Sequence, residues 1–194
     1  MNTPRIVLAS TSRYRAALLR RIIGDFEQVA PDTPEPLLPD ESPRERALRL
    51  AVAKAQIVAA SRPGTLVIGS DQVAALGGTV LRKPGSIEIA HEQLRSSSGN
   101  TVDFYTGLCV VDARDGQHGT ALDHTRVLFR ELADPEIVRY LALEKPLDCA
   151  GSFKSEGAGI ALFERVESHD PTALVGLPLI ALARLLRDAG VKLP

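Results

Sequence analysis

The chain has 194 residues, of which 44% are hydrophobic and 24% are charged, and this is the composition of an ordinary globular domain. Its 23 basic and 24 acidic residues give a net charge of −1, which argues against a general nucleic-acid-binding protein but leaves small anionic ligands open. Because the amino terminus does not resemble a signal peptide and no apolar run reaches the roughly 18 residues of a membrane span, we expect one soluble, cytoplasmic domain over residues 1–194.

The first third of the chain is predicted to form a strand and two helices. Arg5–Ala9 is a short apolar run typical of a buried strand, and residues 13–23 are predicted to form a helix, with capping serine and threonine residues between the two. Residues 31–39 contain four prolines and must form an extended loop. The motif SPRE at residues 42–45 is a capping box with proline at the first helical position, and it predicts a long helix that ends near residue 60.

The middle of the chain is predicted to contain a hairpin followed by a helix. Residues 66–68 begin a buried strand, a Gly-Gly turn leads into Thr79–Leu81, and Ser86 caps a helix that ends near residue 97. The later elements, in chain order, are strands at residues 104–111 and 125–129, a helix from Asp134 that ends before Pro146, a short strand GIALF at 159–163, and a helix from about residue 178 to residue 188. Strands and helices mix and hairpins are present, so we expect a mixed α/β or α+β sheet and not a run of βαβ units.

The first candidate site lies where the first strand gives way to the first helix. Residues 10–15 read STSRYR and combine backbone N–H groups, hydroxyls and arginines, which together can bind an anion. A capped helix with surface arginines is an equally good interpretation of this motif when it is taken alone.

The second candidate is Asp71, in the motif GSDQ between two apolar strand segments. A buried carboxylate is costly unless it is paired or bound to a metal. Gly69 allows a ligand or another backbone to approach closely. A satisfied structural aspartate near a bend is the alternative, and we favour a functional role.

Two lysines form the third candidate. Lys54 lies on the mostly apolar segment AVAKAQIVAA, and Lys83 follows the hairpin. The chain has only 5 lysines against 18 arginines, so the remaining lysines suit a role that needs a compact point charge, such as phosphate binding. Surface lysines whose stems lie along apolar residues are the alternative.

Taken together and in chain order, these segments resemble the Maf family of nucleotide pyrophosphatases. The opening LASTSRYR, the acidic residue Glu35 in the proline-rich loop, and the ending FERVESHDPTALVGLPL are each similar to motifs of that family. The resemblance spans almost the whole chain, and it implies a Maf/ITPase-like fold, in which helices flank a twisted mixed β-sheet and two lobes enclose a central cleft. Two positions depart from the family pattern: Arg13 replaces the usual proline, and Pro34 stands where an aspartate often precedes Glu35.

The resemblance also implies a reaction. It implies hydrolysis of a nucleoside triphosphate between the α and β phosphates, with Asp71 as the base that activates water. Glu35 and Asp71 are the candidates to bind a divalent cation, Mg²⁺ or Mn²⁺, because these ions prefer oxygen ligands. The residues implied to bind phosphate are Ser12, Arg15, Lys54 and Lys83.

Details of the sequence resemble the branch of the family that is associated with 7-methyl-GTP. N7-methylated guanine carries a positive charge, so Tyr14 is implied to stack on its ring and Glu156 to accept hydrogen bonds from its edge. Gln72 is implied to bond the base or to hold the carboxylates. A core aromatic residue at position 14 and a solvated carboxylate at position 156 are the alternatives.

Three functions remain open from the sequence. The first is pyrophosphatase activity on 7-methyl-GTP, the second is house-cleaning hydrolysis of other common or modified nucleotides, and the third is a non-catalytic nucleotide-binding regulator of cell division. In each case the partner is a small nucleotide and not a nucleic acid or a membrane. The resemblance is compatible with a homodimer, which the residues themselves do not indicate.

Overall fold

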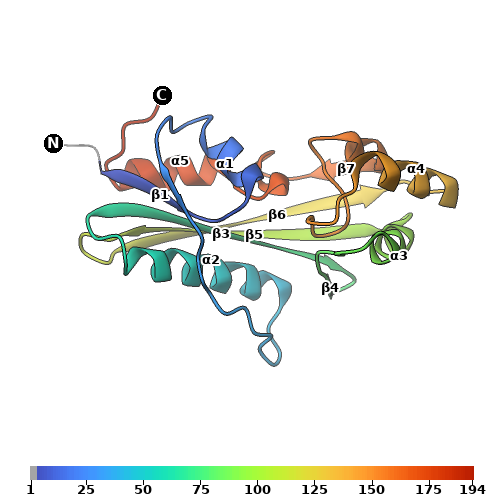
Figure 1. The fold of residues 1–194 in the computed structure, drawn as a ribbon, viewed down its shortest axis with the longest axis horizontal. Helices are drawn as coiled ribbons and strands as arrows, with labels where there is room; N and C mark the ends of the chain where they lie inside the picture. The colour runs from blue at the N-terminus through green and yellow to red at the C-terminus, as the bar shows by residue number, and fades with distance from the viewer. Residues whose placement is uncertain (1–3) are drawn as a thin grey trace.

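A seven-stranded mixed sheet organises the chain. The computed structural model describes residues 4–194 and places five α-helices around this sheet (Figure 1). The strands are β1 (Arg5–Ala9), β2 (Glu27–Val29), β3 (Thr65–Leu76), β4 (Thr79–Leu81), β5 (Thr101–Asp112), β6 (His118–Phe129) and β7 (Phe163–Glu167). Their order is β2-β1-β3-β5-β6-β7, with β4 paired to β3. Strand β1 runs parallel to both of its neighbours, whereas the pairs from β3 to β7 are antiparallel, which confirms the predicted mixed sheet.

The helices divide between the two faces and the two ends of the sheet. They are α1 (Arg13–Leu19), α2 (Pro43–Ala59), α3 (Ile87–Ser97), α4 (Asp134–Glu144) and α5 (Leu179–Asp188), with short 3₁₀ helices η1 (Ala158–Leu162) and η2 (Ala173–Val175). Helix α2 covers one face of the sheet, α1 and α5 cover the other face near β1, and α3 and α4 lie at the opposite end (Figure 1). No helix within residues 4–194 is long and apolar enough to cross a membrane.

The apolar core is split into two main clusters. One cluster joins α1 and α5 to β1 and β3, and its largest members include Leu8, Leu19 and Ile68. The other joins α3 and α4 to β5 and β6 around Phe104 and Phe129. Two apolar clusters at the two ends of one sheet give the chain the two-lobed arrangement that the family resemblance implies.

Two glycines allow α2 to lie directly on the sheet. A Cβ atom added at Gly69 would lie 2.7 Å from the backbone nitrogen of Ala55, and one added at Gly107 would lie 2.6 Å from the carbonyl carbon of Ala47. Real Cβ atoms almost never approach other atoms within 3.0 Å, so only glycine fits these two strand positions. The close neighbour expected at Gly69 is therefore the backbone of α2 and not a ligand.

Local signals located most elements, but two predictions were wrong: the helix expected over residues 13–23 ends at Leu19, and the strand expected at residues 159–163 is absent. The capping box at Ser42 and the cap at Ser86 are both present, and α4 ends before Pro146 as predicted. Residues 159–163, however, do not form a strand: the segment belongs to η1, and the strand β7 begins only at its last residue, Phe163. A short apolar run cannot be assigned to strand or helix by periodicity alone.

Candidate active site

A buried lysine connects the two predicted carboxylates. Lys54 projects from α2, and its Nζ lies 2.5 Å from Oδ1 of Asp71 on β3 and 2.7 Å from Oε1 of Glu35 in the proline-rich loop. Only 11% of the Lys54 side chain is exposed, which excludes the alternative of a surface lysine. The close packing of α2 at Gly69 places this ammonium beside Asp71. Buried charges must be paired, and this cluster pairs one cation with two anions.

Arg15 adds a second, half-buried cation beside the cluster. Its Nε donates to the carbonyl oxygen of Gly176 at 2.8 Å, and its Nη1 donates to Oγ of Ser10 at 3.3 Å. Burial lowers the pKa of Arg15, while the negative charges of Asp71 and Glu35 act in the opposite direction. A guanidinium remains charged even so, and the carbonyl and hydroxyl contacts fix its direction.

The ionisation of Glu35 depends on these cations. Burial raises the pKa of the Glu35 carboxyl, but the hydrogen bond and charge of Lys54, with smaller contributions from Arg46 and Lys83, outweigh burial and leave the pKa below its ordinary value. The carboxylate form is therefore favoured at neutral pH, and this is the form that can bind a cation.

Three adjoining cavities meet at Arg15 and Lys83. Each of the nine residues predicted for the site lines at least one of these cavities: Ser12, Tyr14, Arg15, Glu35, Lys54, Asp71, Gln72, Lys83 and Glu156. The structure thus brings together residues from the turn after β1, α1, the proline-rich loop, α2, β3, the segment after β4 and the loop before η1. The cavities lie between the two apolar clusters, where the predicted central cleft belongs.

The cavities differ in charge. The first is lined by the carboxylates Asp148 and Glu156, by the aromatic ring of Tyr14 and by the core rings Phe104 and Phe153. The second and third are lined by Lys54 as well as by the shared cations Arg15 and Lys83. The first cavity thus balances its two carboxylates against Arg15 and Lys83, whereas cations outnumber carboxylates in the other two.

The motifs and this geometry agree with a comparison of whole sequences. A sequence model of the family described as Maf-like protein matches residues 5–189. This chain belongs to the Maf-like family. A relative from Aromatoleum aromaticum, named 7-methyl-GTP pyrophosphatase, is 55% identical over 194 residues and matches 100% of both chains. A relative of the same name from Xanthomonas axonopodis pv. citri is 56% identical over 191 residues, which is 98% of this chain and 100% of the relative.

A solved structure, that of the Staphylococcus aureus Ham1 protein, covers 67% of this Maf-like chain and 72% of its own, with 18% identity and a TM-score of 0.47. That likeness is too weak to indicate function.

Two of the predicted base-binding residues have partners within the Maf-like protein itself. Nε2 of Gln72 lies 3.0 Å from Oγ1 of Thr106 and from the carbonyl oxygens of Ala173 and Leu174, so this amide anchors the η2 loop. The guanidinium of Arg13 lies 4.8 Å from the centroid of the Tyr14 ring and donates to its hydroxyl at 2.8 Å. Arg13, one of the two departures from the family pattern, is therefore a cation already placed against the ring that is predicted to sense a cationic base.

One residue of the Maf-like site was missed by the sequence reasoning. Buried Asp170 accepts hydrogen bonds from the backbone N–H groups of Thr172 and Ile180, at 2.9 and 2.6 Å, and so fixes the η2 loop to the start of α5. This loop supplies the Gly176 carbonyl that receives Arg15. The sequence DPT, in which an aspartate can bond to the backbone two residues later, was the available signal.

Proposed function

We propose that this protein hydrolyses 7-methyl-GTP to 7-methyl-GMP and pyrophosphate. The observation that carries the proposal is the junction at Arg15 and Lys83 of an aromatic cavity that contains Glu156 with cation-rich cavities that reach Lys54 and Asp71. The substrate has a matching division, because its methylated base is cationic and its triphosphate is anionic. Relatives that are 55 and 56% identical and are named 7-methyl-GTP pyrophosphatase support the same substrate.

In this proposal the triphosphate lies along the cation-rich cavities. Arg15, Lys54 and Lys83 offset its negative charge, and the hydroxyl of Ser12 donates a hydrogen bond. Ser12 also caps α1 by accepting from the backbone N–H of Arg15 at 3.3 Å, so the amino end of this helix faces the same space. Helix amino termini favour anions.

A divalent cation, Mg²⁺ or Mn²⁺, fits this cluster when the substrate supplies further ligands. Among residues 4–194, no three His, Cys, Asp or Glu side chains form a group that could hold a metal ion by themselves. Mg²⁺ is commonly held by one or two carboxylates together with substrate phosphates. Glu35 and Asp71, which share the ammonium of Lys54, would provide the carboxylates. The ion would neutralise phosphate charge as the reaction proceeds.

Asp71 is the proposed general base. A water molecule attacks the α-phosphorus and gives its proton to the Asp71 carboxylate, while the bond from that phosphorus to the bridging oxygen breaks and pyrophosphate leaves. Lys54, 2.5 Å away, fixes the direction of the carboxylate. Asp71→Asn keeps the size of the side chain but removes its basicity, so kcat should fall about 10²–10⁴-fold.

The aromatic cavity that contains Glu156 is the proposed base site. Tyr14 offers a π face to the cationic ring, which is worth about 0.5–2 kcal/mol, and Glu156 accepts charge-assisted hydrogen bonds from the guanine edge, each worth about 1.5–3 kcal/mol. GTP has nearly the same shape as 7-methyl-GTP, so the discrimination between them comes mainly from charge.

The test is a panel of nucleoside triphosphates assayed for pyrophosphate release. We expect the highest kcat/KM for 7-methyl-GTP, lower values for GTP and the lowest for UTP and dTTP, and Asp71→Asn with an unchanged melting temperature should lose the activity. Comparable rates for all nucleotides would replace the proposal with a house-cleaning hydrolase. Tight nucleotide binding without any pyrophosphate release would support a sensor and refute hydrolysis.

A further inference from the structure

The proline-rich segment that carries Glu35 is held in place mainly by side chains. This segment, residues 31–41, is called the strap here, and it leads from the edge strand β2 to the start of α2 (Figure 1). Within the described residues 4–194, the backbone of residues 31–40 makes no hydrogen bond to the backbone of another segment. Its prolines lack the N–H groups that such bonds need, whereas its carbonyl oxygens remain available as acceptors.

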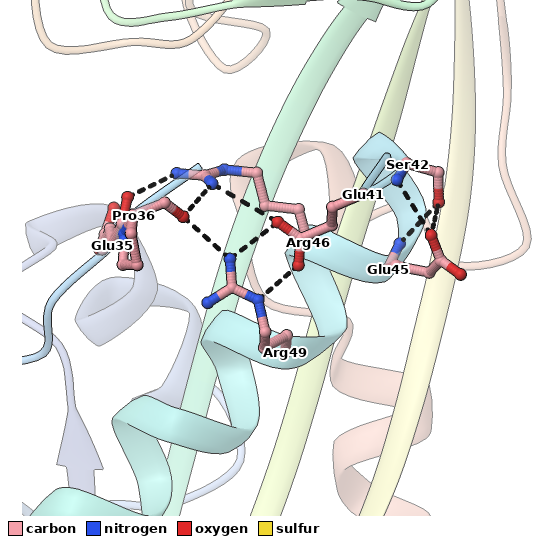
Figure 2. A network of polar contacts seen from close by, with 7 residues as sticks. All are labelled: Glu35, Pro36, Glu41, Ser42, Glu45, Arg46 and Arg49. Atoms are coloured by element: carbon pink, nitrogen blue, oxygen red, sulfur yellow. Dashed lines mark hydrogen bonds and ion pairs between the residues drawn. The ribbon is translucent and has the colours of Figure 1, made fainter. Parts of the chain in front are cut away.

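Arg46 donates hydrogen bonds to two carbonyl oxygens of the strap. Its Nη2 donates to the carbonyl oxygen of Glu35 at 3.0 Å, and its Nη1 donates to the carbonyl oxygen of Pro36 at 2.8 Å (Figure 2). Arg49, one turn further along α2, donates to the same Pro36 carbonyl at 3.1 Å and pairs with Glu41 at the end of the strap. The rigid fork of an arginine can hold two acceptors at once, as a lysine cannot.

Arg46 and Lys54 lie on the same face of α2, and both contact Glu35. Arg46, Leu50 and Lys54 are four residues apart and share one face of α2. Eight residues of helix rise about 12 Å, so Glu35 lies along this face with its carbonyl group on Arg46 and its carboxylate on Lys54. The Glu35 side chain is 46% exposed, so little apolar packing holds it, and the backbone anchor therefore matters.

We propose that Arg46 is a positioning residue that fixes the backbone of Glu35, so that the carboxylate meets Lys54 and Asp71. This inference rests on the proposed function. It also accounts for the departure at position 34: with proline before it, Glu35 acts without a neighbouring acid, so its placement depends on the fork of Arg46. Arg46 also lies 3.6 Å from Glu41 and lines the cavity that holds Lys54 and Asp71, so the test must separate its action through Glu35 from a direct contact with the substrate.

A double-mutant cycle on kcat/KM for pyrophosphate release tests this directly. The variants are Arg46→Met, Glu35→Gln and the double variant, since methionine keeps the apolar stem of Arg46 without the fork. A displacement of about 1 Å at a reacting centre can cost 10²-fold, so Arg46→Met should lower kcat/KM about 10- to 100-fold. In the Glu35→Gln background the same change should cost less than about twofold, because residues that act as one unit are not additive.

The matched control is Arg44→Met, the same change at an exposed position of the same helix, which should leave kcat/KM unchanged. Arg46→Lys, which restores the charge but not the fork, should be intermediate. A readout that is independent of activity is limited proteolysis: the strap should be cleaved faster in Arg46→Met than in the control.

Two results would overturn the proposal. One is an Arg46→Met protein with wild-type kcat/KM and a wild-type rate of proteolysis in the strap. The other is a loss that is equally large in the Glu35→Gln background, which would assign to Arg46 a role in general folding or in direct contact with substrate. If the wild-type protein releases pyrophosphate in the same assay, either result leaves the proposed function standing. A wild-type protein without that activity would refute the function, and the proteolysis experiment would still decide whether Arg46 holds the strap.

Discussion

Adding one methyl group at Gly69 should separate α2 from the sheet and disable the site. In Gly69→Ala the new Cβ would lie 2.7 Å from the backbone nitrogen of Ala55 and closer still to the carbonyl oxygen of Ala51. Both are backbone atoms inside a helix, so neither can rotate aside. Carbon atoms need about 3.5 Å, so the helix must withdraw by about 1 Å.

That displacement acts on Lys54, which is the residue before Ala55. Its ammonium lies 2.5 Å from Asp71 and 2.7 Å from Glu35, so a withdrawal of 1 Å would break or lengthen both ion pairs. Overpacking a core contact costs about 1–3 kcal/mol of unfolding free energy. A misplacement of about 1 Å costs about 10²-fold in rate. We therefore expect both losses in Gly69→Ala.

Urea unfolding and the kcat/KM of pyrophosphate release measure the two losses. Gly24→Ala is the matched control, because a Cβ there meets nothing within 4 Å, and it should be near wild type in both measurements. A Gly69→Ala protein that matches wild type in stability and in kcat/KM would refute this reasoning, since α2 would then have room to adjust without consequence. A loss of stability without a loss of kcat/KM would show that Lys54 keeps its ion pairs with Asp71 and Glu35 although α2 has shifted.

Three further predictions follow from single contacts. The folded-state pKa of Glu35 lies below its ordinary value of 4.5. The difference in unfolding free energy between wild type and Glu35→Gln should therefore be largest above about pH 4.5 and should shrink as the pH falls through the lowered pKa. A difference that is constant with pH would contradict this. Arg13→Ala removes the internal cation from the Tyr14 ring and should raise the preference for 7-methyl-GTP over GTP about two- to fivefold, whereas an unchanged ratio of kcat/KM would show that Tyr14 does not sense charge. Glu144→Ala removes the acceptor that lies 2.7 Å from the Ala158 N–H and so loosens the loop before η1. The KM for guanine nucleotides should therefore rise more than kcat falls. Steady-state kinetics that show the reverse would contradict this.

The sequence specified the local structure of the site better than its assembly. Caps and prolines determine helix ends through contacts within a few residues, so the starts of α2 and α3 were predictable. The start of β3 was predicted at residues 66–68, but its end at Leu76 was not, because the polar residues Ser70, Asp71 and Gln72 interrupt the apolar pattern. The strand β2 has only three residues and no apolar signature, so it was not predicted.

The contacts that unite the site depend on tertiary packing. Lys54 and Asp71 are 17 residues apart in the chain, and their pairing requires α2 to rest on Gly69. The sequence suggested that something approaches Gly69 but not which backbone it is. Likewise, the arginines at positions 46 and 49 read as ordinary helix residues, and only the path of the strap shows that they hold its carbonyl groups.

The distribution of charge offers a reason for the architecture of the site. A substrate with a cationic base and an anionic triphosphate can enter a uniformly positive cleft in either direction, because attraction to the phosphates alone does not orient the base. Here Glu156 lines only the first cavity, Asp148 lies where the first and second cavities adjoin, and Lys54 lines the second and third, with Arg15 and Lys83 at the junction. In the reversed orientation the phosphates would face two carboxylates and the base would face cations, and both juxtapositions are repulsive. Charge would thus select the orientation that brings the phosphates to Asp71, and replacing both carboxylates with amides should weaken productive binding of 7-methyl-GTP more than that of GTP.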